Sequence, residues 1–168
     1  MPVFDGRLLL QIAANYTDAL DLQSPNAPIN LNRQYNFQDG VGVNQANRIW
    51  SDTRTIAASS TDTLDLAGVL SDAFGATLTF ARVKALFVSA HSTNTNNVIV
   101  GGGSNPFVTW VGGAAHTVTV RPGGCFLLIA PDATGYTVTA GTGDILQIAN
   151  SGGGTSVTCD VVIIGGAS

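Results

Sequence analysis

The sequence contains no glutamate and one lysine, Lys84, so its 11 acidic residues are all aspartates. Glutamate and lysine are among the common helix formers, and their near absence argues against a helical protein. Their place is taken by Thr, Val, Gly, Asn, Ser and Ala, in short alternating apolar and polar runs between Gly, Asn, Asp and Pro clusters. This pattern is typical of half-buried strands joined by tight turns, and it predicts an all-β protein.

Charge is also scarce, with 11% charged residues and a net charge of -4. An average soluble domain has about 25% charged residues, so solubility must come from polar uncharged side chains or from surface covered by partners. No Lys or Arg cluster is present to bind nucleic acid, and no apolar run is long enough to span a membrane. The N-terminus does not resemble a signal peptide, so we expect folding in the cytoplasm, with neither nucleic acid nor membrane as a partner.

Two cysteines, Cys125 and Cys159, lie in strand-like sequence. We expect two small buried thiols that pack as hydrophobic residues. A disulfide between them would require neighbouring strands of suitable geometry, which their spacing does not settle.

Two segments of the chain, residues 12–22 and 56–66, have closely similar sequences. Each starts with Ile-Ala-Ala, continues through a polar pair and Thr-Asp, and ends in Leu-Asp-Leu, which fits a strand, a turn and a second strand. We therefore predict a repeated hairpin, with chance similarity in a sequence of low diversity as the alternative.

The first forty residues contain two stretches of turn-forming residues. Stretches rich in Pro, Gly and Asn at residues 24–28 and 38–42 flank one predicted strand, 29–37. We predict an N-terminal arm or hairpin at residues 1–38. Residues 39–168 should form an antiparallel β-sandwich of jelly-roll-like class.

Within the second region, residues 77–90 are apolar on both parities and predict a central strand covered on both faces. Residues 67–75 are expected to form a single helical turn or an ordered loop. Further strands are predicted at residues 97–100, 107–111, 117–120, 125–130, 136–139, 145–149 and 155–164.

Residues that could carry catalysis are scattered. His91 and His116 lack the spacing of metal ligands, and no Gly-x-Ser-x-Gly turn is present. Four aspartates fall in sequence typical of turns, where Asp serves the backbone: Asp18, Asp62, Asp132 and Asp144. We therefore expect no enzyme, no metal and no cofactor.

Tryptophan and arginine, which are enriched at interface hot spots, occur together in one segment as Arg48, Trp50 and Arg54. A second tryptophan, Trp110, follows a Gly-Ser-Asn-Pro loop. Either tryptophan could instead belong to the core of a small sandwich.

Residues 40–59, 65–76 and 130–144 resemble a family of small structural proteins of tailed bacteriophages. The resemblance covers most of residues 39–165 and is loosest in the N-terminal arm. It implies a virion protein similar to capsid decoration (cement) proteins or to domains of tail fibres, and it carries no catalytic residues.

The leading hypothesis is a decoration protein, expected as a homotrimer, that binds the outer surface of the lattice of the major capsid protein. Arg48, Trp50 and Arg54 are the first expected contacts and Phe4 and Arg7 the second, with Trp110 as a further candidate. On this hypothesis Trp50→Ala reduces assembly more than folding. The alternatives are a tail or fibre module that stacks Trp110 or Tyr136 on a host-surface glycan, and, third, a glycan-cleaving enzyme.

Overall fold

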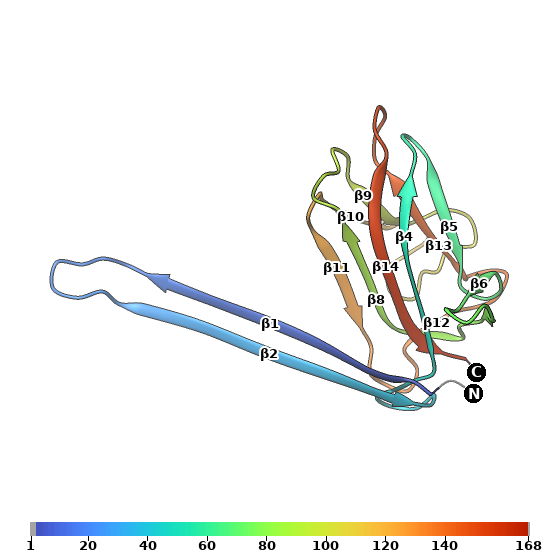
Figure 1. Ribbon diagram of the computed structural model, residues 1–168, viewed down its shortest axis with the longest axis horizontal. Helices are drawn as coiled ribbons and strands as arrows, with labels where there is room; N and C mark the ends of the chain where they lie inside the picture. Colours follow the sequence, from blue (N-terminus) through green and yellow to red (C-terminus); the bar gives the residue numbers. More distant parts are fainter. Residues whose placement is uncertain (1–2, 168) are drawn as a thin grey trace.

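The computed structural model describes residues 3–167 and consists of strands, turns and loops, with no helix in this range (Figure 1). The all-β prediction is therefore confirmed. The strands, in chain order, are β1 (Asp5–Thr17), β2 (Asn26–Asp39), β3 (Gln45–Ala46), β4 (Arg48–Ile56), β5 (Thr61–Asp65), β6 (Leu70–Ser71), β7 (Thr77–Leu78), β8 (Arg82–Ala90), β9 (Val98–Gly101), β10 (Thr117–Val120), β11 (Cys125–Ile129), β12 (Tyr136–Thr137), β13 (Ile145–Asn150) and β14 (Val157–Gly166).

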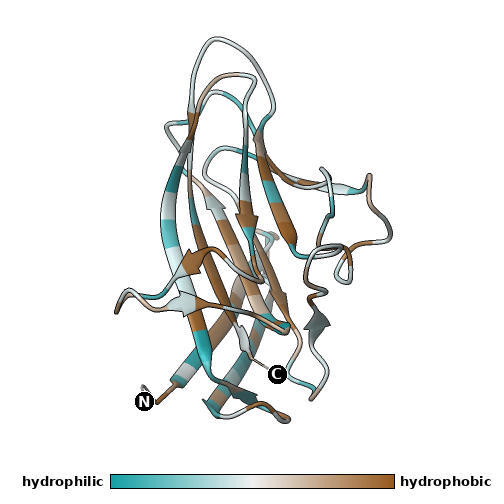
Figure 2. Ribbon diagram, turned by 90° about the vertical axis from the view of Figure 1, so that its right-hand side faces the viewer, coloured by the Kyte–Doolittle hydropathy of each residue, from teal (hydrophilic) through white to brown (hydrophobic). Residues whose placement is uncertain are grey.

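Two antiparallel sheets enclose the main core. One has the order β11-β8-β14-β4, with β12 continuing along the edge of β8, and the other has the order β10-β9-β13-β5. The predicted alternation along β14 places Val157, Cys159, Val161 and Ile163 in this core. Hydrophobic segments, in brown, recur along the strands of the sandwich (Figure 2). The arrangement is consistent with a β-sandwich, and the narrower jelly-roll assignment stays a prediction.

The prediction of a repeated hairpin is wrong. Residues 12–22 form the end of β1 and part of the loop that follows it, whereas residues 56–66 lead from β4 in one sheet to β5 in the other. β4 pairs with β14 and β5 pairs with β13, so the second segment crosses between sheets. Similar sequences therefore form two different connections. The strands with which each segment pairs lie elsewhere in the chain, and these strands determine the connection.

Other strand predictions agree with the structure except at corners. The predicted strand at residues 77–90 is divided into β7 and β8 by a bend at Phe80, whose amide donates to Leu66 O at 2.8 Å. β8 is central and largely buried on both faces, as predicted. Residues 107–111 form a loop instead of a strand, and residues 67–75 form a loop that contains β6.

The N-terminal arm is a two-stranded ribbon that projects away from the sandwich (Figure 1). β1 and β2 pair over thirteen residue pairs, from Asp5 with Gln38 to Thr17 with Asn26. β2 ends at Asp39, one residue beyond the predicted boundary of the arm, and pairs there with the short strand β3.

Candidate interaction surface: the hairpin arm

The arm has one apolar and one polar face. Residues opposite each other in an antiparallel pair point to the same side, and successive residues point to opposite sides. The register therefore places on one face the side chains of Leu8, Leu10, Ile12, Ala14, Tyr16, Ala27, Ile29, Leu31, Arg33, Tyr35 and Phe37. The other face is mostly polar and carries Arg7, Leu9, Gln11, Ala13, Asn15, Thr17, Asn26, Pro28, Asn30, Asn32, Gln34 and Asn36.

At its base, the apolar face packs on the sandwich. We call this part the arm root and define it as Phe4, Leu8, Tyr35 and Phe37. Phe37 is 0% exposed and clusters with Ala46, Ala85 and Ile164, apart from the main core. Ala85 and Ile164 lie on the outer face of the five-stranded sheet, beside Ile129 and Ile49 in register. The root therefore covers an apolar patch that would otherwise face solvent.

Gly6 leaves room for an aromatic ring beside the arm root. A Cβ atom there would lie 2.5 Å from the ring of Phe4, which folds back over this position. The Phe4 amide also donates to Asp39 Oδ1 at 3.3 Å, which ties the two ends of the arm together.

Two cations on β8 fasten the loop after the arm. Lys84 is 0% exposed and its Nζ donates to the carbonyls of Asp132 and Gly42. Arg82 Nη1 donates to Val41 O at 3.2 Å and to Ala133 O at 2.9 Å. Burial lowers the pKa of Lys84 below its ordinary value, since the charged ammonium loses water. The single lysine of the chain thus joins the arm loop to the loop between β11 and β12.

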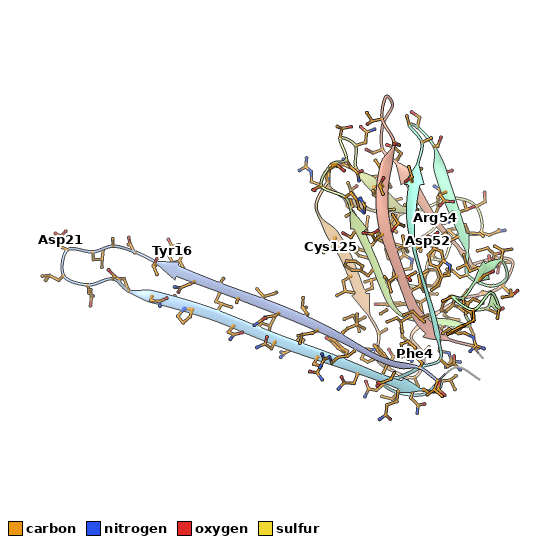
Figure 3. The ribbon with its side chains drawn as sticks, in the orientation of Figure 1. Phe4, Tyr16, Asp21, Asp52, Arg54 and Cys125 are labelled. Carbon is orange, nitrogen blue, oxygen red and sulfur yellow. The ribbon has the colours of Figure 1, made fainter. Side chains whose placement is uncertain are left out.

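Beyond the root, no other segment within residues 3–167 covers the apolar face of the arm. We call residues Leu10–Thr17 and Asn26–Arg33, with the loop between them, the free arm. Its apolar side chains lie in solvent, with exposed fractions of 49% at Ile12, 79% at Tyr16 and 62% at Ile29 (Figure 3). A two-stranded ribbon is only marginally stable by itself in water, so this face is expected to be covered by a partner.

Charges on the free arm are few and separated. Arg33 lies at the inner end, opposite Leu10, whereas Asp18 and Asp21 lie in the loop at the tip. No other charged residue occurs between Leu8 and Tyr35. The free arm is therefore positive at one end and negative at the other.

The predicted interface residues occupy several places. Phe4, Arg48 and Trp50 line one groove of about 820 Å³ between the arm root, β4 and the β6–β7 loop. Trp50 is only 8% exposed and packs in the main core, the alternative given for it, while its role as an interface contact stays a prediction. Arg7 lies on the polar face of the arm and is exposed.

Arg54 is held by two carboxylates. Its Nε lies 2.6 Å from Asp62 Oδ2 and its Nη1 lies 2.9 Å from Asp52 Oδ2. The hydrogen bond to Asp62, followed by that to Asp52, raises the pKa of Arg54. Asp62 lies in strand β5, which corrects its assignment to a turn, and the pair links the two sheets at their edge.

The aromatic residues expected to stack on a glycan pack internally. Trp110 contacts Phe126, with ring centroids 5.4 Å apart, and its Nε1 donates to Phe107 O at 2.8 Å. Tyr136 is half-buried against the main core. Both rings therefore present only part of their surface to a ligand.

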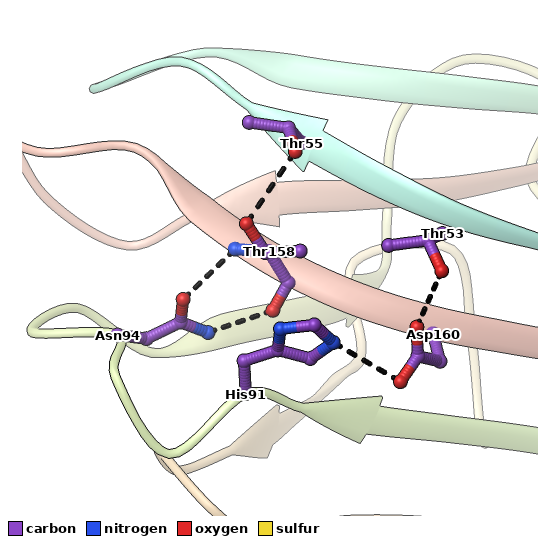
Figure 4. Close-up of polar contacts among 6 residues, drawn as sticks. All are labelled: Thr53, Thr55, His91, Asn94, Thr158 and Asp160. Carbon is purple, nitrogen blue, oxygen red and sulfur yellow. Dashed lines mark hydrogen bonds and ion pairs between the residues drawn. The ribbon is translucent and has the colours of Figure 1, made fainter.

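A polar network on the upper outer face of the five-stranded sheet includes His91 (Figure 4). Thr53 Oγ1 donates to Asp160 Oδ1 at 2.6 Å, and His91 Nε2 lies 3.1 Å from Asp160 Oδ2. The hydrogen bond from Thr53, with that of His91, lowers the pKa of Asp160. A nucleophilic triad needs the hydroxyl beside the imidazole, but here it bonds to the carboxylate. The network fastens a loop to the sheet, assisted by Asn94, which bonds to the backbone of Thr158 at 2.8 Å.

The cysteines differ from each other. Cys159 is buried, as predicted, and burial raises the pKa of its thiol to about 11. Cys125 is exposed, so the prediction of two buried thiols is wrong for this residue. Both are free, and β8 separates their strands.

Residues 3–167 contain no group of three or more His, Cys, Asp or Glu side chains that could hold a metal ion. In the same range, no helix could cross a membrane. No family model, curated protein or solved structure matches this chain.

Sequence reasoning found the arm but missed its two faces. The signal was present as Leu, Leu, Ile, Ala and Tyr at alternate positions from Leu8 to Tyr16. The predicted hairpin at residues 12–22 divides this alternating run, so the continuous apolar face of β1 was not predicted.

Proposed function

We propose that this chain is a virion structural protein that decorates the outer surface of a phage capsid and acts by adhesion. Two observations support the proposal: the resemblance of residues 40–59, 65–76 and 130–144 to phage structural proteins, and the free arm. The arm is the main observation. Its exposed apolar face is unfavourable in water for an isolated protein, but it can be buried against a partner in an assembly.

Stabilisation of the capsid follows from mass action. A protein that binds only the assembled lattice shifts the equilibrium away from disassembly. Contacts that are weak individually become strong when symmetry repeats them on one particle. The arm root and the Lys84 and Arg82 clamp contribute by fixing the direction in which the arm leaves the sandwich.

The groove beside β4 is the proposed contact with the capsid lattice. β4 ends its sheet, so one edge of the strand is free to pair with another strand. Phe4, Arg48 and Ile49 line the groove, as does Phe74, which is 83% exposed. The lining also includes Asp39, Asp52 and Asp72, so the groove combines apolar surface with one positive and three negative charges next to an unpaired strand edge.

Binding to capsids tests this function. Purified protein is mixed with expanded capsids of the source particle that were prepared without it, and both binding and the temperature of capsid disruption are measured. We expect saturable binding and a higher disruption temperature. Absence of binding by the wild-type chain contradicts the proposal.

A matched pair of variants tests the groove. Phe74→Asp places a charge on the groove, and we expect at least a tenfold loss of capsid affinity. Val69→Asp is the control, because Val69 is similarly exposed on the same loop but does not line the groove. Equal binding by both variants would place the lattice contact elsewhere.

Copy number separates decoration from the fibre alternative. A quantified protein gel of the virion should show hundreds of copies of a decoration protein. Tens of copies or fewer would favour a tail or fibre module.

A further inference from the structure

The free arm continues the apolar face of the arm root. At the root this face packs on the sandwich, whereas along the free arm it is exposed. The same apolar face that covers Ala85 and Ile164 at the root continues outward through Ile12, Ile29 and Tyr16. Sheets bury such faces by stacking on a second layer about 10 Å away. The free arm therefore has the chemistry of one layer of a two-layer β-structure.

The charges of the free arm are complementary to those of a second free arm that runs in the opposite direction. Arg33 is at the inner end and Asp18 and Asp21 are at the tip, with only uncharged residues between them. A parallel stack of two such arms would place like charges together. An antiparallel stack places Arg33 of each copy beside the acidic tip of the other, at both ends of the contact.

We propose that the free arm binds the free arm of a second copy of this chain, apolar face against apolar face and antiparallel, about a two-fold axis near Ala14. The contact is isologous, so each residue pair occurs twice. It goes beyond the capsid role and does not depend on it. If trimers form through the sandwich, each copy still has its arm available for a copy in a neighbouring trimer.

The position of the axis sets which apolar side chains meet. With the axis at Ala14, β1 lies over β1 and β2 over β2 of the second copy. Leu31 then faces the small Ala27 of the second copy, Ile29 faces its counterpart, and Ile12 faces Tyr16. Ala14 also faces its counterpart, so the contact has small residues at its centre on β1 and large apolar residues over most of the remainder.

The size of the contact predicts its strength. Eight residue pairs make up the strands of the free arm, which corresponds to a length of about 27 Å and, at a width of about 10 Å, a footprint of about 270 Å² per copy. The exposed tip residues Leu20 and Leu22 add to this area. Standard interfaces bury about 800 Å² per partner, so this pairing is weak in dilute solution and is strengthened where copies are held close together.

Crosslinking at neighbouring alanines tests the pairing. Ala14 lies on the apolar face and Ala13 on the polar face, and both are exposed. Ala14→Cys and Ala13→Cys are made separately in a Cys125→Ala background, which leaves only the buried Cys159, and are treated with a short bis-maleimide. We expect dimers from Ala14→Cys at least tenfold faster than from Ala13→Cys. Equal rates would overturn the proposal.

Charge reversal tests the antiparallel direction. Sedimentation over a range of protein concentrations should show dimers for wild type and at least a tenfold weaker association for Arg33→Asp. Combining Arg33→Asp with Asp18→Arg and Asp21→Arg should restore association. Failure of the combined variant to associate overturns the antiparallel arrangement.

Shortening the arm identifies the surface. In the clipped variant, residues 10–33 are replaced by Asn-Gly between Leu9 and Gln34, which preserves the root and closes it with a two-residue turn. We expect this variant to lose the arm-to-arm dimer. A dimer of the clipped variant, or crosslinking of Ala14→Cys only to a capsid subunit after capsids are added, would contradict arm-to-arm pairing. The capsid-binding experiment is independent of either result.

Discussion

The free arm and the sandwich are built from the same kind of strand, but only the sandwich supplies both layers. In β14, alternate apolar residues meet the opposite sheet and are fully buried, whereas in β1 the same alternation ends in solvent. Local sequence is therefore sufficient to form an amphipathic ribbon and insufficient to cover it. The comparison shows that the described part of the chain supplies no second layer for the free arm, which is why we propose one from a second copy.

The arm root is the transition between these regions. It has the sequence pattern of the arm, but Phe37 is buried and Phe4, Leu8 and Tyr35 are half-buried. The cations of β8 fasten the loop that follows the arm. Four predictions, in order of decreasing effect, test whether the sandwich and the free arm differ in their contribution to stability.

The largest effect is expected from one aromatic residue in each region. Trp50→Ala should lower the free energy of unfolding by about 3–5 kcal/mol, because it removes a large side chain from the main core. Tyr16→Ala should change it by less than about 0.5 kcal/mol in the monomer, since Tyr16 is exposed. Denaturant unfolding at low protein concentration measures both. Similar losses for the two variants would mean that the arm is part of the folded core.

Removal of the arm should separate the root from the free arm. Deletion of residues 1–38 exposes Ala85 and Ile164, and we expect a folded sandwich that is less stable by about 2–3 kcal/mol. The clipped variant keeps the root and should retain wild-type stability within about 0.5 kcal/mol. Thermal and denaturant unfolding of both variants provide the measurement. Complete unfolding of the deletion variant would make the arm integral to the sandwich.

Lys84→Met should loosen the loop that fastens the arm. Met preserves the apolar stem but leaves the carbonyls of Asp132 and Gly42 without their donor, at a cost of about 1–2 kcal/mol. Hydrogen exchange should accelerate in residues 40–44 and 131–135. Arg121→Met, at an exposed position, is the control and should change neither quantity.

Cys159 should make the sandwich, but not the arm, sensitive to alkali. Its pKa is raised to about 11 in the folded protein from an ordinary value of 9.0, so the unfolded chain loses the thiol proton first as the pH rises. Stability from this group is complete below pH 9 and decreases above it, by about 1.4 kcal/mol at pH 10. The pKa of Lys84 is lowered from its ordinary value of 10.5, so its effect has the opposite sign: it makes the folded state more stable as the pH rises towards 10.5.

Variants isolate the contribution of the thiol. The difference in stability between pH 7 and pH 10 should shrink by this amount in Cys159→Ala and persist in Cys125→Ala. An unchanged difference in Cys159→Ala would show that the buried thiol does not carry the effect.

Much of the fold was predictable because strand formation depends on neighbours in sequence. The near absence of Glu and Lys predicted strands, and short apolar or alternating runs between turn residues located β10, β11, β13 and β14 within one or two residues. The arm was also found from its Pro and Gly punctuation. Residues 12–22 and 56–66 show where this reasoning stops, since nearly identical sequences form a strand with a loop in one case and a crossing between sheets in the other.

The candidate site required distant contacts. The sequence left open whether Trp50 and Trp110 face solvent, and packing buries Trp50 in the main core and places Trp110 half-buried against Phe126. Nothing near Lys84 in sequence indicates that it donates to Asp132 and Gly42.

By itself, the amino-acid sequence determined that this chain forms strands, where most of them lie and which of their residues alternate. Only the tertiary structure decided which apolar faces are covered, because strand pairing satisfies the backbone locally whereas burial requires a second layer from elsewhere in the chain. For the free arm no such layer comes from the described part of the chain, and its exposed apolar face is the physical reason to expect a partner.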